Sequence, residues 1–489
     1  MKNVSPESVG ISSEAVCDFV EFIEGCNLRT HSILLMRGDD LFAEMYYAPF
    51  NKDWTHRMYS VTKCFVSVAI GLLEEDGVIS LDDKIIDYFP EKIDGEIHEW
   101  LKNQTIRDML KMTTSGNPSN WFDSEDRDRV HLYLNKNNIR PSNTIWEYDS
   151  PGSQLMCSLV EKVTGKRLFD FLNERIFRHL GCFNTARLLK IPGGDSWGDS
   201  SMLCTPRDLI TFARFVMNRG VWQGKRLMNE EYLKKATTSQ SMNMIRGHKG
   251  VFHYGYGYQF WMCDGGFAFV GMGDQLAVCM PEKDIIFVCN SDNQGNPAEY
   301  EILVSAFLNL IVKKAKDTPL PENPAAKSRL DEISHNRKLF AISGDATSPL
   351  AKKIDGVVYE CQPNPLEMYD FCFTFDRMGG GVLKYHNKNG EMILPFRLNE
   401  NAFGKFPELG YSKEVGGERT TDEHRYDCAT SAAFFDDNKI MVCVQIIDDY
   451  FGNASLLFAF RDEWAVIRAE KNAENFLWKY HGQALAKIK

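Results

Sequence analysis

The chain contains 489 residues, of which 44% are hydrophobic and 25% are charged. That balance is typical of a globular protein and excludes a disordered, collagenous or small disulfide-stapled chain. The net charge of −11, from 56 basic and 67 acidic residues, argues against a nucleic-acid-binding protein, because phosphate contacts need a basic face. At roughly 150 residues per domain, the length predicts two or three domains.

The first residues and the cysteines bear on location and cofactors. No basic segment followed by an apolar stretch opens the chain, so we expect no signal peptide and a cytoplasmic protein. The longest apolar run, residues 65–73, is far short of the ~20 residues of a membrane span. The 13 cysteines are odd in number and contain no CxxC pair, which predicts reduced thiols and no zinc site. We therefore expect no metal, no cofactor and no membrane partner.

The first two thirds of the chain mix helical and strand patterns, which predicts an α+β fold. Helical periodicity favours helices at residues 13–24, 60–75, 152–163, 168–180 and 206–219. Alternating apolar residues favour strands at 32–36, 41–47, 266–270, 275–280 and 285–290, the last three joined by short turns as antiparallel neighbours. Three prolines within residues 318–324 then predict a linker, followed by a short helix at 326–340.

The last third has a different pattern, with short alternating strands separated by turns. The strands are expected at residues 356–359, 370–375, 381–386, 391–394, 432–435, 440–447 and 455–460. This predicts an antiparallel barrel or sandwich of about eight strands, closed by a final helix at 469–479. The expected domains are a large unit at 1–317, a proline-rich linker with a short helix at 318–344, and a β-domain at 345–489.

The sharpest chemical feature is a serine three residues before a lysine, Ser60 and Lys63, at the start of an apolar helix. That spacing puts the hydroxyl and the ammonium on one helix face, one turn apart. Serine is a weak nucleophile until a base lies within hydrogen-bond reach, and a buried lysine can be that base. The alternative is a serine N-cap with a solvated lysine, but a helix that is apolar almost all round favours burial.

Two loops carry further candidate groups. Tyr148 lies two residues before Ser150, where a loop enters a helix, and a phenol there can relay a proton. The alternative is an ordinary turn, since Asp, Ser, Pro and Gly form turns. The segment Gly271-Met272-Gly273 follows a predicted strand, and its backbone N–H groups could complete an oxyanion hole. The alternative there is a glycine-rich hairpin turn.

Together and in this order, the three motifs resemble the active-site elements of the serine β-lactamase and penicillin-binding-protein superfamily, closest to its class C-like branch of esterases, D-amino-acid peptidases and aminohexanoate-oligomer hydrolases. Supporting phrases with the same resemblance occur at residues 31–35, 77–83, 105–116, 163–165, 205–208 and 255–259. The resemblance implies an antiparallel sheet flanked by helices, with an all-helical lobe. The β-domain resembles, more weakly, the lipocalin-like barrels that follow some relatives; it is either a structural appendage, which could also mediate dimerisation, or a source of a loop that limits substrate size.

The resemblance also implies roles for individual residues. Ser60 would be the acylated nucleophile, Lys63 its base and Tyr148 the proton shuttle, while the backbone N–H groups of Ser60 and Met272 would form the oxyanion hole. Substrate-binding positions would be Ser150, Val270, Gly271 and Gln275. The third motif reads Phe269-Val270-Gly271 and so lacks the cation that relatives carry, which argues against efficient hydrolysis of penicillin-like ligands. Asp274 replaces a glycine of the branch.

The expected function is therefore hydrolysis of a small-molecule ester or amide through an acyl-enzyme. The alternative is a catalytically weak or non-catalytic protein of the same fold that binds or senses a ligand; retention of the serine, lysine and tyrosine argues against it. A cell-wall D,D-peptidase is disfavoured by the expected lack of an export signal. The sequence leaves a homodimer open.

Overall fold

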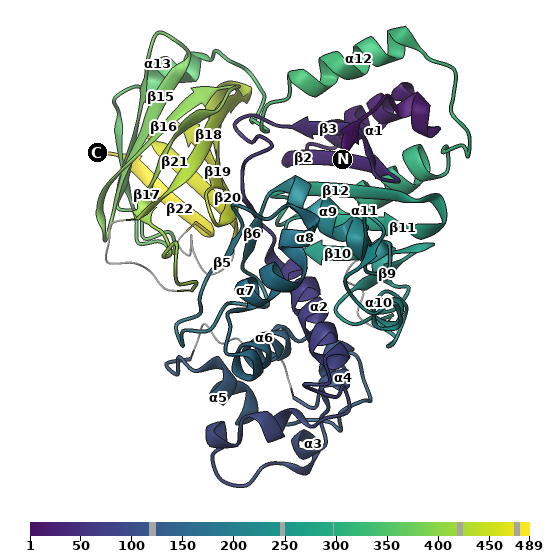
Figure 1. Cartoon of the computed structure of the whole chain (residues 1–489). Coiled ribbons are helices and arrows are strands. Elements are labelled where there is room, and N and C mark those ends of the chain that lie inside the picture. Colours follow the sequence, from purple (N-terminus) through teal and green to yellow (C-terminus); the bar gives the residue numbers. More distant parts are fainter. Residues whose placement is uncertain (117–123, 245–249, 297, 418–423, 474–479) are drawn as a thin grey trace. The chain divides into compact units, whose positions relative to one another are not determined.

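The computed structural model describes residues 1–116, 124–244, 250–296, 298–417, 424–473 and 480–489 (Figure 1). The chain forms two compact units, the first comprising Met1–Lys338 with Glu414–Gly416 and the second comprising Leu339–Lys413 with Gly417–Lys489. Helix α12 (Pro324–His335) follows the prolines of the predicted linker and packs on α1 (Ser13–Gly25) within the first unit. An ion pair between Arg329 and Glu21 joins these helices.

The centre of the first unit is a sheet of mixed direction, in which every pair of neighbours is antiparallel except β1 and β3. Its order is β1-β3-β2-β12-β11-β10-β9. The strands are β1 (Lys2–Asn3), β2 (Thr30–Arg37), β3 (Asp40–Tyr46), β9 (Trp261–Cys263), β10 (Gly266–Gly271), β11 (Gln275–Met280) and β12 (Ile285–Ser291). The five strands predicted here are confirmed, as is the antiparallel succession of β10, β11 and β12.

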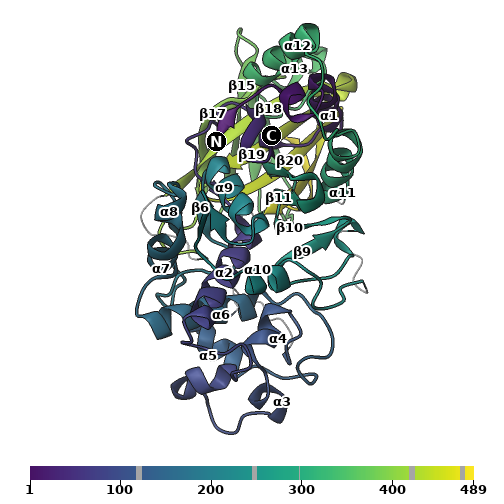
Figure 2. The same cartoon turned by 45° about the vertical axis from the view of Figure 1, so that its right-hand side comes forward.

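Helices cover both faces of this sheet (Figures 1 and 2). Along β2, Ile33 and Leu35 belong to one hydrophobic cluster, and Leu34 and Met36 to the other, because successive strand side chains point to opposite faces. One cluster includes residues of α1 and α11 (Glu299–Ala306), and the other includes residues of α2 (Thr62–Glu75) and α9 (Pro206–Met217). The sheet therefore fixes α2, and with it the serine–lysine pair, against a buried apolar surface.

A helical lobe lies beyond α2 and carries the second motif (Figure 2). Its helices are α3 (Glu99–Lys102), α4 (Ile106–Leu110), α5 (Arg129–Leu134), α6 (Ser150–Thr164), α7 (Leu168–Leu172) and α8 (Arg178–Leu180). Helix α6 matches the helix predicted at residues 152–163, and α7 and α8 with the helical turns between them match 168–180. The first unit also contains a three-stranded sheet of order β4-β6-β5, formed by β4 (His56–Arg57), β5 (Arg187–Leu188) and β6 (Met202–Cys204). A two-stranded sheet of β7 (Val221–Trp222) and β8 (Lys225–Arg226) precedes α10 (Glu230–Ala236) along the chain.

The second unit is a closed β-barrel preceded by α13 (Pro349–Ile354). In the described residues nine strands close the ring, because β16 pairs with β18, and β17 adds a tenth strand beside β18. The strands are β13 (Val358–Cys361), β14 (Asp370–Phe375), β15 (Gly380–Asn387), β16 (Gly390–Leu398), β17 (Ala402–Leu409), β18 (Arg425–Phe435), β19 (Lys439–Ile447), β20 (Phe451–Arg461), β21 (Trp464–Ala473) and β22 (Gly482–Ile488).

The final helix predicted at residues 469–479 is wrong where the structure describes it. Residues 469–473 belong to β21, which pairs with β20 along its whole length, and residues 474–479 lie outside the described part. Ala465, Ile467 and Ala469 are buried while their neighbours are not, which is the alternation of a strand. The alanines, glutamates and lysines here favour helix by local propensity, but the barrel's ladder outweighs that preference.

In the described residues no helix combines the length and the apolar character needed to cross a bilayer. All thirteen cysteines are free thiols.

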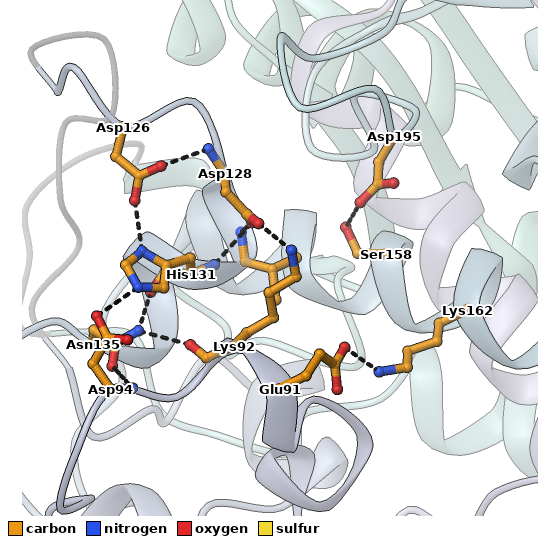
Figure 3. A network of polar contacts seen from close by, with 11 residues as sticks. Glu91, Lys92, Asp94, Asp126, Asp128, His131, Asn135, Ser158, Lys162 and Asp195 are labelled. Carbon is orange, nitrogen blue, oxygen red and sulfur yellow. Dashed lines mark hydrogen bonds and ion pairs between the residues drawn. The ribbon is translucent and has the colours of Figure 1, made fainter.

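A network of polar contacts joins α5 to two loops of the lobe (Figure 3). The His131 ring lies between two carboxylates, with Nδ1 2.6 Å from Asp126 and Nε2 2.8 Å from Asp94. Asp128 caps α5 by accepting the backbone N–H groups of Val130 and His131, and it also pairs with Lys92. The hydrogen bonds to Asp126 and Asp94 raise the pKa of His131.

We expect this raised pKa to make the lobe more stable in acid. The stabilisation from protonated His131 is fully present below the ordinary histidine pKa of about 6.5 and is lost as pH rises through the raised folded-state pKa. Because Asp94 is largely exposed, the effect is small, about 0.5–1 kcal/mol. Thermal unfolding of the wild type and of His131→Gln should differ at pH 5.5 and converge above pH 8; a constant difference across that range would contradict the assignment.

Candidate active site

The predicted nucleophile and base lie within hydrogen-bond reach of each other. Ser60 is in a 3-10 turn (Tyr59–Val61) that leads directly into α2. Lys63 Nζ donates to Ser60 Oγ at 3.0 Å and to the backbone carbonyl of Asp199 at 2.7 Å. Lys63 is 1% exposed, which excludes the alternative of a solvated surface lysine. A buried amine that is hydrogen-bonded to the serine hydroxyl and to a backbone carbonyl is arranged for proton exchange with the hydroxyl.

The turn that carries Ser60 is held in an unusual backbone conformation. Tyr59 has a φ of +45°, in the left-handed region that non-glycine residues rarely adopt. Its neighbours fix it, because the Met58 amide donates to the Met202 carbonyl at 2.7 Å and β4 pairs with β6. Strain of this kind persists only where the surroundings over-determine it, and it concentrates at functional sites.

The third motif touches this same turn. A Cβ atom on Gly271, the last residue of β10, would lie 2.4 Å from the Met58 carbonyl oxygen. Only glycine therefore allows the strand to approach the nucleophile's turn this closely. Met272 follows Gly271 directly, which brings the two predicted oxyanion-hole residues, Ser60 and Met272, into neighbouring segments; whether their N–H groups act as that hole stays a prediction.

The remaining residues of the third motif are buried and bonded within the protein. Gln275 is fully buried, and its Nε2 donates to the Ser291 carbonyl at 2.6 Å and to the Met272 carbonyl at 3.1 Å. Val270 is part of a hydrophobic cluster. Through these contacts Gln275 braces the third motif, and substrate contact by Gln275, Val270 or Gly271 stays a prediction.

The second motif is held beside Lys63 by aromatic stacking. Lys63 Nζ lies 5.1 Å from the centre of the Tyr148 ring. That ring stacks on Trp261 of β9, with centroids 5.6 Å apart and planes 28° apart. Trp146, two residues before Tyr148 in the same loop, also packs against Trp261. The structure thus brings Tyr148 to the serine–lysine pair. Ser150, which was predicted to bind substrate, is the first residue of α6 and is partly buried.

Both neighbours of Tyr148 are anchored in the lobe. Glu147 pairs with Arg140. Asp149 caps α6 by accepting the Gly152 amide at 2.9 Å, and it also accepts from Thr114 Oγ1 at 2.7 Å and from the Tyr133 hydroxyl at 3.1 Å. These bonds use the carboxylates on either side of Tyr148 and leave its ring to stack on Trp261.

We expect Asp149→Asn to loosen this anchor. The change removes the charge that faces the buried Lys136 ammonium at 3.8 Å and weakens the helix cap, at a cost of about 2–4 kcal/mol in the free energy of unfolding. Urea unfolding measures that cost. Displacement of Tyr148 should also lower kcat more than it raises KM. An unchanged unfolding midpoint would contradict the anchoring role.

Sequence reasoning missed three residues of the site. Arg57 is fully buried, and its guanidinium lies 4.5 Å from the centre of the Tyr59 ring. The feature of the sequence that could have pointed to Arg57 is its position three residues before Ser60. Trp261 lies on a three-residue strand too short to predict. Asp199 is in a loop without periodicity. Within the described residues, no group of three His, Cys, Asp or Glu side chains is placed to hold a metal ion.

Comparison with known proteins adds independent information. The family described as Beta-lactamase matches residues 19–304. A 6-aminohexanoate-dimer hydrolase of Paenarthrobacter ureafaciens is 24% identical over 254 residues, which are 48% of this chain and 64% of that protein. Penicillin-binding protein 4* of Bacillus subtilis is 28% identical over 174 residues, 32% of this chain and 37% of that protein. The chain thus spans less than two thirds of each of these two relatives.

Among solved structures, a putative beta-lactamase from Bacteroides dorei aligns with a TM-score of 0.50 at 15% identity, covering 60% of this chain and 96% of that one. At that identity the likeness concerns the fold alone. The family match at residues 19–304 includes Ser60, Lys63 and Tyr148.

Proposed function

Because the chain belongs to the beta-lactamase family, we propose that it is a serine hydrolase that forms an acyl-enzyme on Ser60 and hydrolyses a small ester or amide. The observation that carries the proposal is the 3.0 Å hydrogen bond from a fully buried Lys63 Nζ to Ser60 Oγ. Nucleophile and base within that distance are the arrangement that activates a serine.

In the proposed reaction Lys63 begins as the neutral amine. It takes the Ser60 hydroxyl proton as Oγ forms a bond to the substrate carbonyl carbon, and the backbone N–H groups of Ser60 and Met272 hold the resulting oxyanion. Tyr148 then gives its phenol proton to the leaving alcohol or amine as that group's bond to carbon breaks, and Lys63 returns to Tyr148 the proton taken from Ser60. Water next attacks the carbonyl carbon of the acyl-serine ester and gives a proton to Lys63. The bond to Ser60 Oγ breaks, the carboxylic acid leaves, and Lys63 passes that proton to Ser60 Oγ.

The third motif and one relative bear on the choice between amides, esters and lactams. The third motif, Phe269-Val270-Gly271, lacks the cation expected to hold a penicillin-type carboxylate, which favours neutral esters and amides over lactams. The relative named 6-aminohexanoate-dimer hydrolase is consistent with an amide substrate. We favour a carboxylesterase or an amidase, including a D-amino-acid peptidase.

A hydrolysis panel tests this proposal. It comprises p-nitrophenyl esters of increasing acyl length, D-amino-acid amides and nitrocefin, each with wild type and with Ser60→Ala. We expect turnover of at least one ester or amide that Ser60→Ala lowers by about 10³-fold or more, and little turnover of nitrocefin. Turnover that survives in Ser60→Ala, or none with any substrate while a ligand still binds, would contradict the proposal; the second result would favour a binding protein of the same fold.

A further inference from the structure

The residue whose carbonyl holds Lys63 also carries a buried acidic side chain. Asp199 is 2% exposed. In the described part of the chain, its Oδ1 is buried without a hydrogen-bond partner. A buried carboxylate that lacks a full set of hydrogen bonds is costly unless positive charge compensates it. Three cationic residues near Asp199 supply such charge.

Two arginines and Lys63 act electrostatically on the Asp199 carboxyl. Arg57 of β4 donates Nε to the carbonyl of Ser200, the residue after Asp199, at 3.0 Å, and its guanidinium lies 4.6 Å from the Trp197 ring centre. Arg129, the first residue of α5, lies 4.9 Å from the same ring centre. Burial raises the pKa of Asp199, while the charges of Lys63, Arg129 and Arg57 and the neighbouring Trp197 indole oppose that rise.

The other titratable groups near this cluster do not replace Asp199. Cys157 of α6 interacts with Asp199, and burial raises the pKa of that thiol well above its ordinary value, so it stays neutral. Tyr148 presents its ring to Lys63. Glu161 and Asp195 also act on the Cys157 thiol, and Asp199 is the acidic residue on which Lys63, Arg57 and Arg129 all act.

We infer that the Asp199 side chain is a positioning group for Lys63: its carboxylate balances the charge of Arg57 and Arg129, and thereby sets the pH at which Lys63 can accept the Ser60 proton. The inference rests on the proposed function of Lys63 as a base. The sign of the effect follows from Coulomb's law, since a nearby anion favours the ammonium form and nearby cations favour the free amine.

The test is the pH profile of kcat/KM in paired variants. Asp199→Asn keeps the shape and the carbonyl but removes the charge, so the acidic limb should move to lower pH by about one unit, while the maximal rate falls. Arg129→Gln should move the limb the opposite way, and Arg129→Lys should restore it. The matched control is Asp195→Asn, four residues earlier in the same loop, where the carboxylate accepts the Ser158 hydroxyl at 2.7 Å; its limb should coincide with wild type.

The outcomes separate this inference from the proposed function. If wild type forms a Ser60 adduct with an acylating probe but the Asp199→Asn and Arg129→Gln limbs coincide with wild type, the inference fails and the proposed function stands. If wild type forms no Ser60 adduct, both fail. A loss of rate without a shift of the limb would show a merely structural role for Asp199. Should Asp199→Asn fail to fold, the opposite shifts of Arg129→Gln and Arg129→Lys decide the matter.

Discussion

Replacing Lys63 by methionine should lower kcat/KM by about 10³–10⁴-fold while the protein remains folded. Methionine keeps a straight side chain of similar length and removes the amine. The buried site then loses its base, and Ser60 Oγ loses the donor at 3.0 Å. Because the lysine is buried beside the Asp199 carbonyl, some loss of stability is also expected, and circular dichroism should be recorded alongside the rate.

A matched control is Lys162→Met. Lys162 lies on α6, pairs with Glu91 and is 38% exposed, so its removal should leave kcat/KM within about twofold of wild type, as is usual for an exposed pair. A Lys63→Met enzyme with wild-type activity would contradict the assignment of Lys63 as base.

Replacing Gly271 by alanine is the second change with a large expected effect. The added Cβ would lie 2.4 Å from the Met58 carbonyl oxygen and 3.0 Å from Gln275 Cβ. Either β10 or the Ser60 turn must therefore shift. Overpacking of this kind costs about 1–3 kcal/mol, and because the displaced atoms belong to the reacting geometry, kcat/KM should fall by about 10²-fold or more.

Gly25→Ala serves as the comparison. A Cβ on that glycine, at the end of α1, meets nothing within 4 Å, so both unfolding and turnover should match wild type. Activity assays and urea unfolding of the two variants decide the question. If Gly271→Ala were as active as wild type, the close approach of β10 to the nucleophile would not matter for turnover.

The sequence predicted the sheet of the first unit well because its strands have strong signals. Residues 275–280 and 285–290 are apolar runs between turn residues, and the structure has them as β11 and β12. It failed at β21, where helix-favouring residues 469–473 are held as a strand by pairing with β20. Local propensity cannot anticipate a partner strand that closes a barrel.

The serine–lysine pair was predictable because its spacing is local, within one helix turn. Its partners were not. Tyr148 is 85 residues from Lys63 along the chain by their numbers, and only the family resemblance related the two. Asp199 and Trp261 reach the site through tertiary packing. Asp199 contacts Lys63 by its backbone carbonyl, a group that any residue type could supply. The bracing of the third motif by Gln275 depends on the Ser291 carbonyl of a neighbouring strand.

The measurement that tests the central claim most directly is the intact mass of wild type and Ser60→Ala after incubation with a fluorophosphonate probe. We predict one adduct on the wild type, mapped to the peptide that contains Ser60, and none on Ser60→Ala. An unmodified wild type, or an adduct that persists in Ser60→Ala, would contradict the claim that Ser60 is an activated nucleophile.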